Sequence, residues 1–565
     1  KVCTNACREQ CHNRRNNENF RSFCSLCIRS PTRTLLFQVL DLNLNNICEA
    51  DSIARFTLSS LKELTLEHNC ISQITRFQNA QIQRLVFREN FLTNVTAGAF
   101  QQLKKLTTLD LSNNSIAKLS DSLFARNSVL QEINLSINKL TSALMLFNNT
   151  QKIKIIKLSF NRIVDISLTF NGLTQLRELY MRYNLISSIP DGAFQDNFDL
   201  VHIDFTSNHI AWIGKSAFKG LLRLRVLHLH KNKIISLNGS ASNLPKLHYL
   251  GASQNAILRL EAGEFLNNLE LTTISLAANN ISNVEGAFIG AFSLAHLNLA
   301  ANQLELLRRS DFSPDIIAPA VVLIEDNPLT CDCRLAWLMQ EESSIQVRGI
   351  ARCAKPFWLK GEQLSLLPHE DLLRWEDKCE PGCHCHCNVR AHAERDITVN
   401  CSSATAGRIP RVLPESTTQL DLSGNGLRLL DDVIKTAAPH LEVLVLKDNA
   451  LISINVTSIP LTVNHLDLRG NKLKRLPLFL VTQLNLTSIW LSGNPYTCDC
   501  DDYLFRRWLQ AHGNMVRDSN DIMCGRSSNL LVSRKRFITL GQNDLCPAAI
   551  PREVVYVLVA FGMYN

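Results

Sequence analysis

The chain has 565 residues, 45% of them hydrophobic, and a formal net charge of +8 from 59 basic and 51 acidic residues. This hydrophobic content is enough to bury a continuous core, which excludes a disordered chain. The sequence shows no lysine- and arginine-rich run typical of a nucleic-acid-binding tail. It also shows no nucleophile–base pair or phosphate loop, so an enzyme is not expected.

The 19 cysteines fall into three groups, with seven between Cys3 and Cys70, eight between Cys331 and Cys401, and four between Cys498 and Cys546. Clusters of this kind at the ends of blocks favour disulfide-bonded caps in an oxidising compartment. The sequence shows no signal peptide, so Lys1 is expected to be a mature start. Nine Asn-x-Ser/Thr sequons agree with secretion and predict glycosylation at Asn94, Asn113, Asn134, Asn148, Asn238, Asn280, Asn400, Asn455 and Asn485.

Residues 1–36 are predicted to form a cysteine-rich N-terminal cap. Cys48 and Cys70 lie at turns of adjacent repeats and could reach each other. An odd number of cysteines then remains, so one is free, bridges two chains, or belongs to a different pairing. The remaining five are Cys3, Cys7, Cys11, Cys24 and Cys27.

Residues 37–330 carry the pattern Leu-x-x-Leu-x-Leu-x-x-Asn about thirteen times, with a period of 21 to 25 residues. This is the leucine-rich-repeat signature, and it recurs about four times in residues 411–497. Leucines two apart point to one face of a short strand, so stacked strands form a parallel sheet. The expected fold is an α/β solenoid, a curved horseshoe with the parallel sheet on its concave face. The motif asparagine is expected to bind backbone groups where the chain leaves each strand.

A phenylalanine usually follows the motif asparagine by nine or ten residues. These residues are expected to form a buried row under the convex side rather than a ligand site. They are Phe100, Phe124, Phe170, Phe194, Phe218, Phe265, Phe288 and Phe312.

A solenoid exposes apolar ends, which caps must cover. Residues 331–379 and 498–547 share the plan Cys-Asp-Cys, then a Trp-Leu pair, then two more cysteines, and are predicted to be C-terminal caps. Residues 380–410 resemble the N-terminal cap of a second block. The apolar residues 548–565 are expected to be a final strand or tail, or the start of a membrane-spanning segment, which would need about 20 residues.

The run Cys383-His384-Cys385-His386-Cys387 also suggests a zinc site, because thiolate and imidazole are good zinc ligands. In an extended chain, however, the cysteines and histidines would point to opposite sides. The usual spacing of two to four residues between paired ligands is also absent. Disulfide caps are therefore favoured over zinc, and no metal or other cofactor is predicted.

Two repeat blocks, separated by a four-cysteine C-terminal cap and a four-cysteine N-terminal cap, resemble the ectodomain of an insect Toll receptor over essentially the whole chain. Spacing alone cannot give disulfide connectivity. The resemblance implies the pairs Cys331–Cys353, Cys333–Cys379, Cys383–Cys387, Cys385–Cys401, Cys498–Cys524 and Cys500–Cys546.

The same resemblance implies a cell-surface, single-pass receptor whose transmembrane helix is missing from this chain. The expected partner is a dimeric cystine-knot cytokine of the Spätzle type, with a receptor homodimer as a further possibility and no nucleic acid. Concave positions are the expected contacts, because aromatic and arginine side chains there suit an interface. They are Glu63, Glu67, His68, Arg84, Arg88, Phe160, Tyr180, Arg182, Tyr183, His202, Asp204 and His228, with Thr65, Val86, Glu89, His230 and Tyr249 beside them.

Asn134 is expected on the same concave face. A glycan there would push a protein ligand toward one end or one edge of the block, and the N-terminal end is favoured. The concave histidines are expected to be ordinary polar residues, although a pH-sensing role is an alternative.

Two other functions are open at this stage. Some adhesion receptors also carry two capped leucine-rich blocks, although those blocks are more nearly equal than thirteen and four repeats. Direct sensing of microbial ligands, as in vertebrate Toll-like receptors, is the other. The lack of a dense basic stripe on the concave positions counts against nucleic acid as that ligand.

Overall fold

The computed structural model describes residues 38–50, 60–314, 316, 319–339, 345–375, 377–389, 395–476, 483–525 and 532–545. The predicted cap at 1–36, with its five cysteines, lies outside these ranges, as do Cys546 and residues 548–565. The chain divides into two compact units. Unit 1 contains residues 1–330, 340–354 and 361–365, and unit 2 contains residues 331–339, 355–360 and 366–565.

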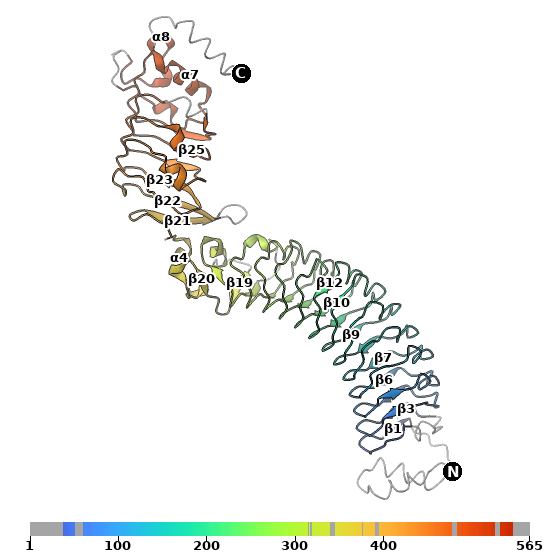
Figure 1. Cartoon of the computed structure of the whole chain (residues 1–565). Coiled ribbons are helices and arrows are strands. Elements are labelled where there is room, and N and C mark those ends of the chain that lie inside the picture. Colours follow the sequence, from blue (N-terminus) through green and yellow to red (C-terminus); the bar gives the residue numbers. More distant parts are fainter. Residues whose placement is uncertain are drawn as a thin grey trace, which may run out of the picture. The chain divides into compact units, whose positions relative to one another are not determined.

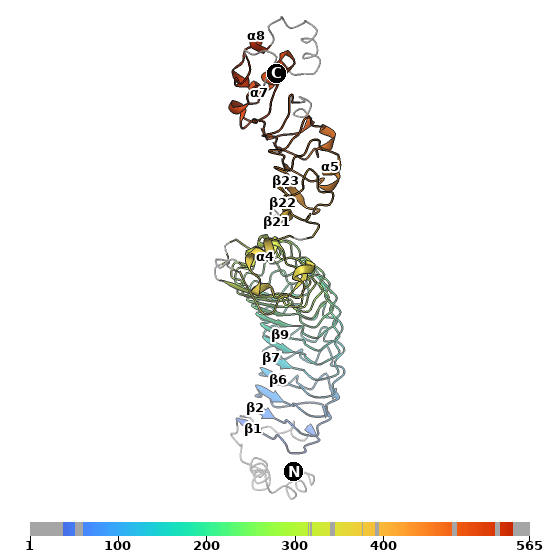
Figure 2. The same cartoon turned by 90° about the vertical axis from the view of Figure 1, so that its left-hand side faces the viewer.

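Unit 1 is a leucine-rich-repeat solenoid, as predicted. Its main sheet has 14 strands within the described residues, and neighbouring strands pair in parallel along the chain. Figures 1 and 2 show the strands stacked along one side of unit 1. The strands are β1 (Val39–Asp41), β2 (Glu63–Thr65), β4 (Arg84–Val86), β6 (Thr108–Asp110), β7 (Glu132–Asn134), β8 (Ile155–Lys157), β9 (Glu178–Tyr180), β11 (His202–Asp204), β13 (Val226–His228), β14 (Tyr249–Gly251), β15 (Thr273–Ser275), β16 (His296–Asn298), β17 (Ala320–Leu323) and β19 (Ile345–Arg348).

Most of the three-residue strands bury their middle side chain and leave their first and third residues partly exposed on the concave face, although the third residue is buried in β4, β11 and β14. In β9, for example, Leu179 is fully buried while Glu178 and Tyr180 stay partly exposed. This alternation follows from the two-residue period of a strand. Six strands of two or three residues lie outside the main sheets within the described residues: β3 (Gln73–Ile74), β5 (Asn94–Val95), β10 (Ser188–Ile189), β12 (Trp212–Ile213), β18 (Leu329–Thr330) and β20 (Cys353–Lys355).

The motif asparagines form a buried ladder that joins successive turns. Asn184 donates from Nδ2 to the carbonyl oxygens of Leu158 in the preceding turn (2.9 Å) and Met181 in its own turn (3.0 Å). Its Oδ1 accepts the backbone N–H of Ile163 at 3.0 Å. The same contacts recur along the block, for example at Asn114 and Asn302. The predicted role of this residue is therefore confirmed.

The predicted phenylalanine row is also present and buried. Stacked rings link Phe170 to Phe194 and Phe194 to Phe218, each with centroids 6.0 Å apart. A second asparagine row accompanies it at positions 127, 197 and 268. Asn197, for example, donates to the carbonyl oxygens of Phe170 and Leu173 at 2.9 and 3.0 Å. This second row was not predicted from the sequence.

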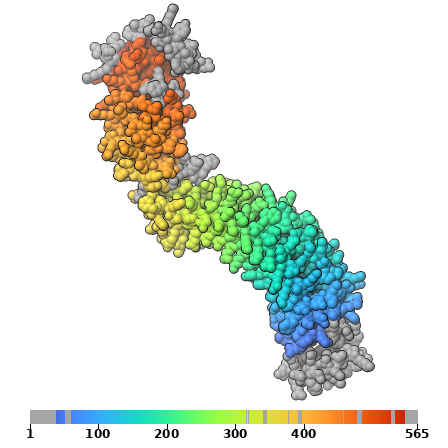
Figure 3. Space-filling view, in the orientation of Figure 1, coloured from blue at the N-terminus to red at the C-terminus, as the bar shows by residue number. Residues whose placement is uncertain are grey.

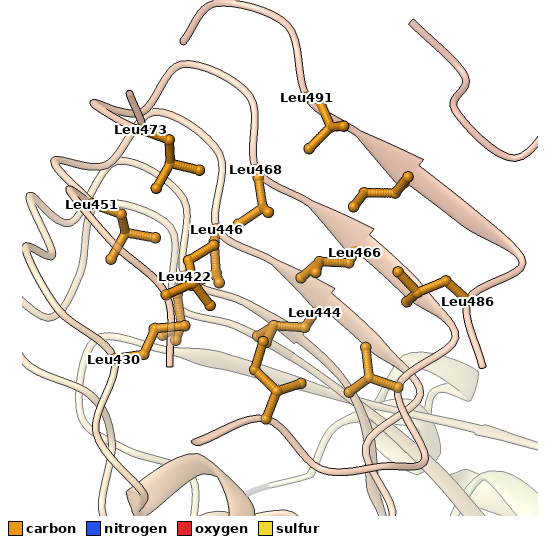
Figure 4. Close-up of a cluster of buried hydrophobic side chains, with 14 of the residues drawn as sticks. Leu422, Leu430, Leu444, Leu446, Leu451, Leu466, Leu468, Leu473, Leu486 and Leu491 are labelled. Atoms are coloured by element: carbon orange, nitrogen blue, oxygen red, sulfur yellow. The ribbon is translucent and has the colours of Figure 1, made fainter. Parts of the chain in front are cut away.

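Unit 2 is a shorter solenoid with a six-stranded sheet among its described residues. Its strands are β21 (His384–Val389), β22 (Arg395–Asn400), β23 (Thr417–Asp421), β24 (Val443–Val445), β25 (His465–Asp467) and β26 (Ser488–Trp490). Leucines from successive turns fill its core (Figure 4), and the space-filling view shows a closed outer surface over the turns (Figure 3). The short helices of unit 2 are α4 (His369–Leu373), α5 (Val433–Ala437), α7 (Tyr503–Ala511) and α8 (Gln542–Leu545).

The cysteines at the start of unit 2 form disulfide bonds, but three of the pairs implied by the resemblance are wrong. The structure pairs Cys498 with Cys524, in agreement with that expectation, and Cys48 with Cys70 in unit 1. It does not contain the expected pairs Cys333–Cys379, Cys383–Cys387 and Cys385–Cys401. The observed pairs are Cys333–Cys387, Cys379–Cys385 and Cys383–Cys401. Cys331, Cys353 and Cys500 are also disulfide-bonded.

The hairpin of β21 and β22 explains this difference. Four residues of extended strand separate Cys383 from Cys387 by about 13 Å, well beyond the Cα separation that a disulfide can span, about 4.4–6.8 Å. The antiparallel register pairs His384 with Asn400, which brings Cys383 opposite Cys401 with Cα atoms 4.3 Å apart. Cys385 is then free to bind Cys379. Because all three cysteines of the run are in disulfides, none is available as a zinc thiolate.

The asparagine ladder predicts a measurable loss of stability when one member is removed. Asn184→Ala leaves the backbone N–H of Ile163 without its side-chain partner. It also removes one of the two asparagine donors to the carbonyl oxygens of Leu158 and Met181, which keep Asn161 and Asn208 respectively. We expect the variant to lose about 1–3 kcal/mol of unfolding free energy, the cost of one unsatisfied buried group. Denaturant unfolding followed by circular dichroism measures this loss. The exposed Asn149 gives a matched control, and Asn149→Ala should change stability by less than about 0.5 kcal/mol. Equal midpoints for the two variants would contradict the ladder's role.

Candidate functional site

The concave face of unit 1 gathers the predicted contact residues into two separate groups. Residues from β2 and β4 and the turns after them form an ionic group, which contains Glu63, Glu67, His68, Arg84, Arg88 and Glu89. Residues from the turn after β8 through β14 form an aromatic group, which contains Phe160, Tyr180, Arg182, Tyr183, His202, Asp204, His228, His230 and Tyr249. The strand register places β6, β7 and β8 between the two groups.

Opposite charges are paired within the ionic group. Arg84 contacts Glu63 across neighbouring strands, with Nε 2.9 Å from Oε1. Glu89 accepts from two residues, His68 through Nδ1 at 2.7 Å and Arg88 through Nη2 at 3.0 Å. The three basic side chains are about half exposed (48–53%), so a ligand can reach them. Exposed pairs of this kind contribute little stability, which leaves them available for electrostatic recognition.

Asn134 lies on the strand surface between the two groups. Its Nδ2 donates to Asp110 at 3.1 Å, and its Oδ1 accepts the backbone N–H of Ser136 at 3.1 Å. Lys157 and Glu132 form an ion pair beside it at 2.7 Å, which sequence reasoning missed. The side chain therefore faces the concavity, as predicted, and a glycan on Nδ2 would stand between the ionic and aromatic groups.

The aromatic group is a chain of ring contacts that crosses four strands. Tyr180 and His202 have ring centroids 4.9 Å apart, His202 and His228 are 5.4 Å apart, and His228 and Tyr249 are 5.0 Å apart. Tyr180 donates from its hydroxyl to Glu178 at 2.9 Å. The buried Asp204 lies below the rings, with Arg182 Nη1 3.8 Å from its Oδ2.

The hydrogen bonds of His230 fix its tautomer. Its Nδ1 accepts the backbone N–H of Ser253 at 3.2 Å, so the proton of the neutral ring is on Nε2, which donates to the Tyr249 hydroxyl at 3.0 Å. The ring lies over Gly251, where any Cβ would clash with Nε2. Gly251 is the third residue of β14, a position at which the other strands carry side chains. This glycine was the sequence signal that could have revealed the contact with His230.

Burial disfavours the charged form of the three clustered histidines. Partial desolvation lowers the pKa of His202, His228 and His230, although nearby Asp204 opposes the shift in each case. Burial and the hydrogen bond to Glu178 raise the pKa of Tyr180 to about 12, and burial raises the pKa of Tyr249. The described residues contain no group of three His, Cys, Asp or Glu side chains arranged to hold a metal ion.

The structure refines the place of four predicted contact residues. His68, Glu89, Phe160 and Tyr183 lie in the turn after each strand rather than on the strand, and each has a left-handed backbone with φ between 50° and 57°. They therefore line the edge of the concave face where the strands end. Phe160 and Tyr183 stack with centroids 4.4 Å apart.

Comparison with known proteins agrees with this fold. A family model described as "Leucine rich repeat" matches residues 80–140, 151–210 and 198–257. Protein toll of Drosophila melanogaster is 27% identical over 381 residues, which is 59% of this chain and 34% of that protein. Toll-like receptor 7 of the same organism is 26% identical over 282 residues, which is 44% of this chain and 19% of the relative.

The chain is a leucine-rich-repeat solenoid with similarity to Toll receptors. It spans about a third of the length of protein toll and about a fifth of Toll-like receptor 7. Among solved structures, the Toll–Spatzle complex from Drosophila is 22% identical and aligns over 90% of this chain and 77% of that chain, with a TM-score of 0.43. The disulfide bonds and the similarity to Toll receptors indicate an extracellular or cell-surface location. Among the described residues of the chain, no helix has the length and apolar character that crossing a bilayer requires.

The lowered pKa values of the three histidines predict weaker stability in mild acid. An unfolded histidine has a pKa of about 6.5, so below this pH the unfolded chain binds more protons than the folded one, and stability falls as pH decreases. The denaturant midpoint of the wild type should therefore drop between pH 7.5 and pH 5.5. His202→Gln/His228→Gln/His230→Gln should show a smaller drop, whereas His296→Gln, at an exposed position of β16, should keep the wild-type drop. An equal drop in all three proteins would contradict the assignment.

Proposed function

We propose that this chain is the extracellular ligand-binding part of a single-pass Toll receptor. Its ligand would be a dimeric cystine-knot cytokine of the Spätzle type, and ligand-driven association of receptors would signal in innate immunity, development or both. The observation that carries the proposal is the similarity to Drosophila protein toll across 59% of this chain. The extended sheet of unit 1, which offers partly exposed side chains on every turn, is a surface of the size that a protein ligand needs.

Within this proposal, the ionic group at the N-terminal end of unit 1 is the first contact for the cytokine. Its arginines are half exposed and are held in place by carboxylates, so they can meet acidic groups on a partner with little reorganisation. Such charges raise the association rate and set the orientation of the complex. A glycan on Asn134 would favour this end, because it would hinder a protein that approaches the middle of the concave face.

The proposal predicts that the chain forms a stable complex with a processed Spätzle-type cytokine. Pull-down with such cytokines, followed by light scattering of the eluted complex, tests binding and stoichiometry. Reversal of the two arginine charges, Arg84→Glu/Arg88→Glu, should weaken affinity by at least tenfold, because each change puts a carboxylate next to Glu63 or Glu89 and repels an acidic partner.

The matched control reverses two exposed charges outside the strands, Arg126→Glu/Lys152→Glu, and should bind like the wild type. If the wild-type chain binds none of the processed cytokines, the proposed function is wrong. If the two double variants bind equally well, the function stands and the N-terminal site is wrong.

A further inference from the structure

One position in every turn of unit 1 has a backbone conformation that bulky side chains disfavour. This residue immediately precedes the buried motif asparagine, and its φ lies between 50° and 58° in all thirteen turns. Left-handed backbone is tolerated best by Gly, Asn and Asp, whereas a β-branched or bulky residue there is an outlier. The residues are Leu44, His68, Glu89, Asn113, Ile137, Phe160, Tyr183, Ser207, Lys231, Gln254, Ala278, Ala301 and Asp326.

Three consecutive turns place bulky apolar residues at this position, namely Ile137, Phe160 and Tyr183. We call these three residues the apolar ridge. Their side chains remain 48%, 43% and 45% exposed, so the ridge is not part of the core. Backbone hydrogen bonds join the three turns, from Ile137 N–H to the Ser159 carbonyl and from Phe160 N–H to the Arg182 carbonyl, each at 2.8 Å. The ridge therefore combines backbone strain with solvent-exposed apolar surface, and apart from the stack of Phe160 on Tyr183 neither of these stabilises the fold.

Further exposed side chains extend the ridge beyond the asparagine row. Val164 and Leu185 are 51% and 41% exposed, and the Leu185 N–H donates to the Ile163 carbonyl at 2.9 Å, which places the two turns side by side. Lys139 and Arg162 occupy the position two residues after Ile137 and Phe160. Both are exposed, and neither has a carboxylate or side-chain hydrogen-bond partner within the described part of the chain.

The positive charges of Lys139 and Arg162 distinguish between two candidate partners for the ridge. A second copy of the chain, packed ridge against ridge about a twofold axis, would bring Lys139 and Arg162 close to their own symmetry mates, and like charges at an interface are costly. An acidic partner segment would pair with both cations while its apolar side chains cover the ridge. The sequon at Asn113 occupies the preceding position of the same row, so a glycan there would limit the ridge at its N-terminal end and leave Phe160 and Tyr183 open.

We propose that the apolar ridge, with Lys139 and Arg162, is a second docking surface that binds an acidic segment with apolar side chains on the Spätzle-type ligand. The inference rests on the proposed function and adds a contact at the edge of the concave face, beyond Asn134. A partner that covers Phe160 and Tyr183 would account for exposed aromatic side chains at strained positions, because aromatic side chains supply much of the energy of an interface.

The test uses the full chain and a processed Spätzle-type cytokine, with affinity measured by surface plasmon resonance. Ile137→Asn/Phe160→Asn/Tyr183→Asn should bind at least tenfold more weakly. Its thermal midpoint should equal or exceed that of the wild type, because asparagine suits the left-handed position. Two other exposed apolar residues of unit 1, Ile235 and Leu258, are each 52% exposed and give a matched control. Ile235→Asn/Leu258→Asn should bind within twofold of the wild type.

A second variant, Lys139→Glu/Arg162→Glu, tests the charge requirement independently of the ridge side chains and should also bind at least tenfold more weakly. If the wild type binds and the ridge variant binds equally well, the inference is wrong while the proposed function stands. If only the charge variant keeps wild-type affinity, the acidic character of the partner segment is wrong. If the wild type binds no cytokine, the proposed function fails and the inference fails with it.

Discussion

The buried asparagine of each turn is the contact on which the rest of unit 1 depends. A chain that leaves a strand and turns inside a protein must satisfy its backbone N–H and C=O groups without water. Asn184 does this by donating to two carbonyl oxygens and accepting one N–H, and its equivalents repeat the pattern along the block. The ladder joins each turn to the one before it, while the leucines below it exclude water.

Because the asparagine ladder and the leucine core stabilise the solenoid, the exposed side chains can differ from turn to turn. In most turns the middle strand residue and the asparagine belong to the core, whereas the first strand residue and the residue before the asparagine do not. The same backbone therefore carries the Arg84–Glu63 pair in one turn and the Tyr180–His202 contact in others. The apolar ridge is an exception, because the fold imposes a left-handed backbone at Ile137 and isoleucine disfavours that conformation.

Much of this arrangement follows from sequence period alone. The spacing of leucine and asparagine identified the strands and the ladder, and the later phenylalanines identified the buried row. Contacts that depend on register between distant residues could not be predicted in this way. The disulfide of Cys383 depends on which residue of β22 lies opposite it, and the tautomer of His230 depends on Ser253 and on the missing side chain of Gly251. The second asparagine row escaped notice because only some turns carry it, as at Asn127 and Asn197.

The central claim is that a protein ligand binds unit 1 along the concave strands and their edge. Hydrogen–deuterium exchange of the full chain, with and without a processed Spätzle-type cytokine, tests it most directly. The account predicts slower exchange in peptides that cover β2 and β4 and in those that cover residues 135–139 and 158–164. Slower exchange confined to unit 2, or to the convex phenylalanine segments of unit 1, would contradict it.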